Sequence, residues 1–150
     1  MPSQQYGYRN YAAVRDGIPE TVLRPTVSFT VAHGTFSWSA DALIDTGSPV
    51  SVFTRNVADA LELSLASAMD RQKIAIAGGL HEAFKFPISL ALDPLDEMSW
   101  NTFGWFLCGD MESWKLPVSA LFGTEGFFDR WKVTFALRDG YFSVGPYSEQ

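Results

Sequence analysis

The chain has 150 residues, a length that suits a single domain. Its 11 Lys and Arg against 17 Asp and Glu give a net charge of −6, which argues against a nucleic-acid binder with a basic face. Hydrophobic residues make up 47% of the chain, which excludes a wholly disordered protein. No apolar run approaches the ~20 residues that span a bilayer, and the first 17 residues do not resemble a signal peptide. We therefore expect a cytoplasmic protein without nucleic-acid or membrane partners.

The N-terminal segment differs from the rest of the chain. Residues 1–20 are polar and contain Gly7, Gly17 and Pro19, whereas the apolar content rises from Arg24 onward. We predict a flexible N-terminal arm over residues 1–20, followed by one domain over residues 21–150. The composition shows no internal repeat and no linker within that domain.

The apolar residues mostly alternate with polar ones, which is the pattern of half-buried β-strands. Residues 27–31 alternate, residues 33–34 (His-Gly) mark a turn, and residues 36–38 resume the alternation, so we predict a hairpin. Thr54 is a suitable N-cap for a short helix over residues 55–61.

A second hairpin is predicted around a pair of glycines. Residues 74–76 and 84–86 flank Gly78 and Gly79, which favour a flexible turn. A loop is expected over residues 93–98. Further strands are expected at residues 88–92, 100–107, 118–122, 131–135 and 141–144, with one or two helical turns at residues 124–128 and a turn at residues 139–140. Many short strands between turns predict an all-β fold, a barrel or a sandwich with little helix.

The sharpest feature for function is the segment over residues 42–48, Ala-Leu-Ile-Asp-Thr-Gly-Ser. Asp45 ends an apolar strand, where a charge is costly to bury unless it is hydrogen-bonded. Thr46 supplies a hydroxyl, and Gly47 lets a backbone N–H approach the carboxylate. Such a turn holds an acid in the way that activation of a water molecule requires. The bland alternative is an ordinary turn in which Asp45 accepts local hydrogen bonds.

The wider chain resembles the retropepsin-like aspartic proteases, the family of the retroviral proteases. In that family, apolar residues precede Asp-Thr/Ser-Gly-Ala/Ser, a glycine-rich flap hairpin follows, and a second signature combines two apolar residues with a glycine. Residues 42–48, 78–79 and 121–123 match these features in order, and residues 24–27 resemble the first strand of many members. The resemblance covers roughly residues 24–144 and implies a small closed β-barrel of the retropepsin type, with one or two short helices.

The resemblance also implies a homodimer that cuts peptide bonds. An aspartic protease needs two facing carboxylates that share a proton, and this chain offers one such motif. Asp139 precedes Gly140 directly, without the intervening Ser or Thr, so it is interpreted as part of a hairpin turn. The active unit would then contain Asp45 from each of two copies, and its substrate would be a peptide or protein.

The resemblance assigns roles to individual residues. Asp45 would be the shared catalytic acid and base. The residues that would support the active site are Thr46, Gly47, Ser48, Leu121, Phe122 and Gly123. The flap residues that would bind substrate are Ala77, Gly78, Gly79 and Leu80.

Two departures from the family stand out. Retroviral members place Arg and Asp after the second glycine, where this chain has Thr124 and Glu125, so the mode of dimerisation stays open. Retroviral chains also lack a segment like residues 1–20, and residues 93–98 and 110–115 look like insertions.

The remaining candidate residues are interpreted as structural or surface residues without a functional role. His33 and His81 are expected in turns or at the surface, and Cys108 as a small buried residue. A single cysteine makes no intramolecular disulfide. The acidic residues of the predicted loop are Asp93, Asp96 and Glu97, and they lack calcium-loop spacing, so we expect no metal and no cofactor.

Two alternatives remain to the protease hypothesis. The same barrel could bind peptides or mediate dimerisation without cutting anything. The chain could also be an unrelated β-barrel in which the Asp-Thr-Gly sequence is coincidental.

Overall fold

A computed structural model describes residues 3–76, 78–93, 97–109 and 117–148. The strands are β1 (Gln4–Gly7), β2 (Arg9–Arg15), β3 (Ile18–Arg24), β4 (Thr26–His33), β5 (Phe36–Ile44), β6 (Val52–Phe53), β7 (Asp70–Ile76), β8 (Gly79–Leu92), β9 (Ser99–Leu107), β10 (Ala120–Phe122), β11 (Trp131–Ala136) and β12 (Tyr141–Pro146). The helical elements are α1 (Arg55–Ala60) and the 3-10 turns η1 (Leu65–Ser67) and η3 (Leu137–Asp139). The all-β class predicted from the sequence is confirmed.

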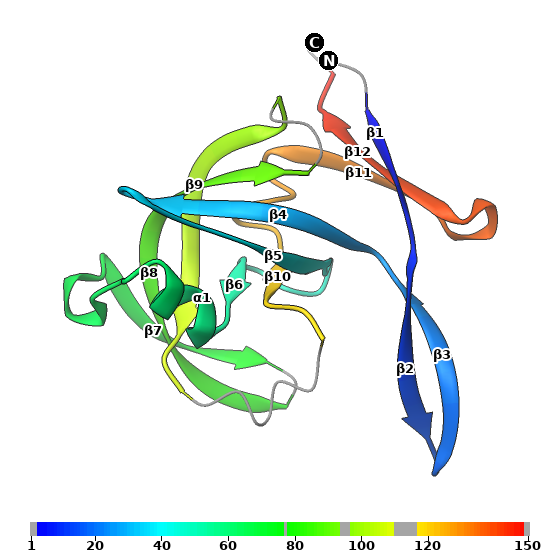
Figure 1. Ribbon diagram of the computed structural model, residues 1–150, viewed down its shortest axis with the longest axis horizontal. Helices are drawn as coiled ribbons and strands as arrows, with labels where there is room; N and C mark the ends of the chain where they lie inside the picture. Colours follow the sequence, from blue (N-terminus) through cyan, green and yellow to red (C-terminus); the bar gives the residue numbers. More distant parts are fainter. Residues whose placement is uncertain (1–2, 77, 94–96, 110–116, 149–150) are drawn as a thin grey trace.

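The central feature is a closed barrel. Its strands pair in the order β4-β5-β10-β6-β9-β8, and the ring closes because β8 also pairs with β4 (Figure 1). The β5–β10 and β6–β9 pairs are parallel, and the other pairs of the ring are antiparallel. β7 pairs with β8 outside the ring and extends it as a hairpin. The small closed β-barrel expected from the sequence is therefore present.

The alternation along the strands builds two apolar clusters on opposite faces. Inside the barrel, Phe29 lies 5.2 Å from Phe122 and Phe53 lies 4.9 Å from Phe106, measured between ring centroids. The neighbouring positions of the same strands face the other way and form a second cluster, here called the outer cluster. Its buried members are Val52, Ile76, Ala83, Trp105, Leu107, Val118 and Leu121. The outer cluster thus links β7 and β8 to β10.

The N-terminal segment is folded into strands where the sequence predicted a flexible arm. β1 pairs with β12 in a three-stranded sheet with β11. β2 and β3 form a hairpin that projects away from the barrel (Figure 1). Its turn uses Asp16 and Gly17, both with positive φ. β3 runs from Ile18 to Arg24 and so crosses the expected boundary between residues 20 and 21. The division of the chain into an arm and a domain stays a prediction.

The helical predictions are met in part. α1 follows Thr54 as expected and ends at Ala60, but the buried Thr54 side chain makes no capping hydrogen bond. The helical turns predicted at residues 124–128 are wrong. The segment forms irregular turns because Gly126 has φ +99° and Glu125 forms a bridge with Val50. None of the helices in the described part of the chain is long and apolar enough to cross a membrane.

Candidate active site

Asp45 comes directly after β5, at the point where β5 lies beside β10. The Asp45 backbone N–H donates to the carbonyl of Phe122 at 2.9 Å, which fixes the turn to the end of β10. The Gly47 N–H donates to Asp45 Oδ1 at 2.9 Å, so the carboxylate is oriented by its own turn. Asp45 is half-buried, and Thr46 and Gly47 are exposed. The carboxylate is therefore held in place and remains reachable from solvent.

Ser48 closes the turn from the inside. Its buried hydroxyl donates to the Val50 carbonyl at 2.6 Å, and its N–H donates to the Asp45 carbonyl at 3.2 Å. The segment after β10 braces the same turn, because the Thr124 N–H donates to the Ser48 carbonyl at 2.9 Å. Backbone hydrogen bonds from residues far apart in the sequence thus hold the Asp45 turn in place.

Gly123 lies where the two segments come closest. A Cβ at this position would lie 2.4 Å from the carbonyl oxygens of both Ser48 and Val50, so only glycine fits there without a backbone shift. The two residues before Gly123 continue the contact, since Leu121 is in register with Leu43 and Phe122 with Ile44. The structure therefore brings the predicted supporting residues of both segments together.

Ser51 belongs to this arrangement although the sequence did not single it out. It is fully buried, its hydroxyl accepts from the Gly123 N–H at 3.1 Å, and it donates to the Glu125 carbonyl at 2.9 Å. Glu125 also forms an ion pair with Lys85 of β8 at 3.4 Å. The usable signal was a serine within the apolar run of residues 50–53, where a polar side chain needs a partner.

The predicted flap lies at the turn between β7 and β8. Gly78 has φ +83°, and Gly78, Gly79 and Leu80 are all exposed. The fourth flap residue, Ala77, lies outside the described residues. Below the turn, Ile76 shares the outer cluster with Leu121, so the hairpin packs against the strand that leads to Gly123. The structure thus joins this hairpin, through the outer cluster, to Leu121 and Leu43, each two residues before Gly123 or Asp45.

The other candidate residues make contacts of their own. His33 makes a hydrogen bond through Nδ1 to the Pro87 carbonyl at 2.9 Å. Cys108 is half-buried, with its thiol 3.7 Å from Glu82 Oε2. His81 is also half-buried. Within the described ranges, no three His, Cys, Asp or Glu side chains gather in a way that could hold a metal ion. Of the predicted acidic loop, Asp93 and Glu97 are exposed and Asp96 lies outside the described residues.

Comparison with known proteins identifies the fold. No protein-family model and no curated protein sequence matches the chain. Among solved structures, a retropepsin-like aspartic protease from Rickettsia conorii matches with a TM-score of 0.56 at 16% identity, over 95% of this chain and 92% of that one. EIAV protease in complex with the inhibitor HBY-793 matches with a TM-score of 0.45 at 20% identity, over 67% of this chain and 82% of that one. The chain has a retropepsin-like fold.

Proposed function

We propose that the chain is an aspartic endopeptidase whose active unit is a homodimer, with one Asp45 from each subunit. The observation that carries the proposal is the Asp45 turn itself. Its carboxylate accepts a hydrogen bond from Gly47, its backbone is tied to Phe122, and Gly123 fits against the turn. This support occurs in a fold that the chain shares with a retropepsin-like aspartic protease.

The chemistry follows from two carboxylates that share one proton. The ionised carboxylate takes a proton from a bound water, and the resulting hydroxide attacks the peptide carbonyl carbon. The protonated carboxylate donates its proton to the carbonyl oxygen, which gives a neutral tetrahedral diol. The C–N bond then breaks as the leaving nitrogen takes a proton from one carboxyl group, while the other carboxylate takes a proton from a hydroxyl of the diol. These transfers give the free amine and the carboxylic acid and leave the pair with its one shared proton. Because the pair must hold one proton, we expect maximal activity on the acidic side of neutrality.

The substrate would bind as an extended peptide against the hairpin of β7 and β8. An extended peptide pairs with an exposed strand edge through its backbone, and pockets for its side chains give specificity. The exposed turn contains Gly78 and Gly79, and glycine has the backbone freedom that closing over a substrate would require.

The decisive experiment compares Asp45→Asn with Asp139→Asn, a control in the exposed turn between β11 and β12. Cleavage of a peptide library is followed by mass spectrometry, and solution mass by light scattering over a concentration series. We expect a dimer, a loss of at least about 1,000-fold for Asp45→Asn, and no loss for the control. A monomer at every concentration, or full activity of Asp45→Asn, would refute the proposal. If the wild type and Asp45→Asn both bind a peptide and neither cleaves it, the result would favour a binding module.

A further inference from the structure

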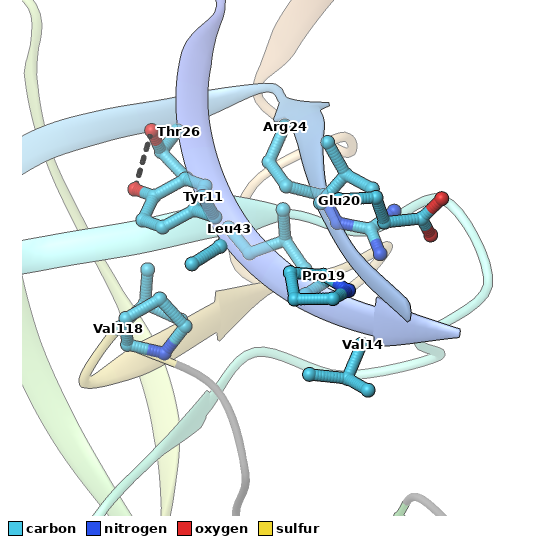
Figure 2. A pocket seen from close by; sticks show the side chains of 12 residues that line it. Tyr11, Val14, Pro19, Glu20, Arg24, Thr26, Leu43 and Val118 are labelled. Atoms are coloured by element: carbon cyan, nitrogen blue, oxygen red, sulfur yellow. Dashed lines mark hydrogen bonds between the residues drawn. The ribbon is translucent and has the colours of Figure 1, made fainter. Parts of the chain in front are cut away.

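A cavity of about 540 Å³ lies between the β2–β3 hairpin and the barrel (Figure 2). Its volume falls within the roughly 300–1,000 Å³ that is typical of ligand pockets. The hairpin forms one wall and residues of β4, β5 and the segment before β10 form the other. Most of the lining is apolar, and its charged members are Glu20 and Arg24.

The base of the hairpin is fixed to the barrel by side chains. Arg9 of β2 lies 3.0 Å from Asp41 of β5 and donates to Ser28 of β4 at 3.0 Å, and Ser28 donates to Asp41 at 2.7 Å. One step further along the hairpin, the Tyr11 hydroxyl donates to Thr26 Oγ1 at 3.0 Å (Figure 2). The wall therefore has a defined position relative to β4 and β5.

The same face of β5 connects this wall to the candidate active site. Ala42 and Ile44 point into the barrel core, so Asp41, Leu43 and Asp45 follow one another on the opposite face. Alternate residues of a strand are about 6.6 Å apart. Asp41 thus anchors the hairpin, Leu43 lies in the cavity, and Asp45 follows at the next position of the row.

We propose that the β2–β3 hairpin is the outer wall of a substrate subsite, which takes a large apolar side chain of the bound peptide. The proposal rests on the proposed function, because it is the row ending at Asp45 that places the cavity beside the scissile bond. If the extended peptide runs along this row, it advances about 3.3 Å per residue, so the side chain concerned lies about two residues from that bond. The apolar lining residues Val22, Leu43 and Val118 select it by contact.

The hairpin offers matched variants on its two faces. Ala13 and Val22 line the cavity and are half-buried, whereas Thr21 and Leu23 are exposed and do not line it. Ala13→Phe fills the cavity and Val22→Ala widens it. Thr21→Phe and Leu23→Ala make comparable changes on the other face.

The readout is peptide binding in the Asp45→Asn background, measured by fluorescence anisotropy. The probes are labelled octapeptides in which each position in turn is Ala, Leu, Phe or Trp. At one position we expect Phe to bind about tenfold more tightly than Ala, and Ala13→Phe to abolish that preference. Val22→Ala should shift the preference toward Trp, and the two control variants should retain the original order.

Several outcomes would overturn the subsite. One is that no labelled peptide binds. Another is that Ala13→Phe keeps the wild-type order of affinities for the Ala, Leu, Phe and Trp peptides. A third is that the control variants change that order as much as the cavity variants do. A loss of dimer mass in Ala13→Phe would also overturn it, since the cavity would then receive the second subunit. The two proposals fail separately. If the wild type never cleaves a peptide but Ala13→Phe changes the order of peptide affinities, only the protease proposal is refuted. If the wild type cleaves and Ala13→Phe leaves that order unchanged, only the subsite is refuted.

Discussion

The Asp45 turn and the β2–β3 hairpin differ in how they are held to the rest of the protein. The turn is bound to the segment after β10 by backbone hydrogen bonds and by the close approach of Gly123. The hairpin pairs only within itself in the described part of the chain, and its base is held by side chains such as Arg9. Toward its end Val14 is 72% exposed and Ile18 is 67% exposed.

This difference separates two physical tasks. An isolated two-stranded hairpin is marginally stable in water, so the β2–β3 hairpin depends on its few contacts with the barrel. A turn held by backbone hydrogen bonds from two segments keeps a carboxylate in a fixed place, as general acid–base chemistry demands. A wall attached at one end can adapt to different side chains. Changes in the turn should therefore cost more stability than changes in the hairpin.

The largest effect is expected from Gly123→Ala. Its Cβ would lie 2.4 Å from two carbonyl oxygens, so backbone must move in the very turn that carries Asp45. We expect about 3 kcal/mol of destabilisation and a fall of about 10 °C in the melting temperature. Calorimetry measures both. Gly7→Ala is the matched control, because nothing lies within 4 Å of its added Cβ. Equal melting temperatures for the two variants would show that the turn is less closely packed than described.

A smaller effect is expected from Ser51→Ala. The change removes a buried hydroxyl that bridges Gly123 and Glu125, and it leaves the Gly123 N–H without that partner. An unsatisfied buried group costs about 1–3 kcal/mol, so the midpoint of urea unfolding should fall clearly. Ser89→Ala, which removes an exposed hydroxyl, should leave the midpoint nearly unchanged. A similar midpoint for both variants would show that the Ser51 hydroxyl does not stabilise the turn.

The strands of the first hairpin and the location of the turn could be predicted because their signals are local, whereas the closed barrel was expected from the resemblance to the retropepsin-like proteases. The alternation over residues 27–31 and 36–38 marks a hairpin that the structure contains as β4 and β5. The run that ends at Asp45 marks the end of a strand. The role of Ser51 could not be found in this way, because its partners Gly123 and Glu125 lie more than 70 residues further along the chain.

The N-terminal hairpin was missed for a different reason. Its apolar residues do not alternate regularly with polar ones, because residues 11–14 and 22–23 are consecutive apolar positions, and only the Asp-Gly pair at residues 16–17 marks its turn. The predicted helical turns at residues 124–128 failed because Gly126 adopts a positive φ, which continues no helix. The conformation of this second segment is also held by contacts with another part of the chain, because Ser51 donates a hydrogen bond to the Glu125 carbonyl.

The smallest expected effect concerns the anchor of the hairpin and its dependence on pH. Partial burial raises the pKa of Asp41, but the hydrogen bond from Ser28 and the Arg9 guanidinium outweigh it and hold the pKa below its ordinary value of 3.8. A depressed pKa contributes stability above the ordinary value, and this contribution is lost as the pH falls through the folded-state pKa. Because both side chains are about 40% exposed, solvent screening limits it to about 0.5 kcal/mol.

Hydrogen exchange of the hairpin amides measures this contribution directly. Protection factors of β2 and β3 should fall between pH 5 and pH 3 in the wild type, and about 1 M salt should reduce the difference. Asp41→Asn should have low protection at both pH values, whereas Asp139→Asn, a change in the exposed turn between β11 and β12, should behave like the wild type. If Asp41→Asn kept the wild-type pH dependence, another group would hold the hairpin, and the contrast between the braced turn and the wall anchored at Asp41 would need a different origin.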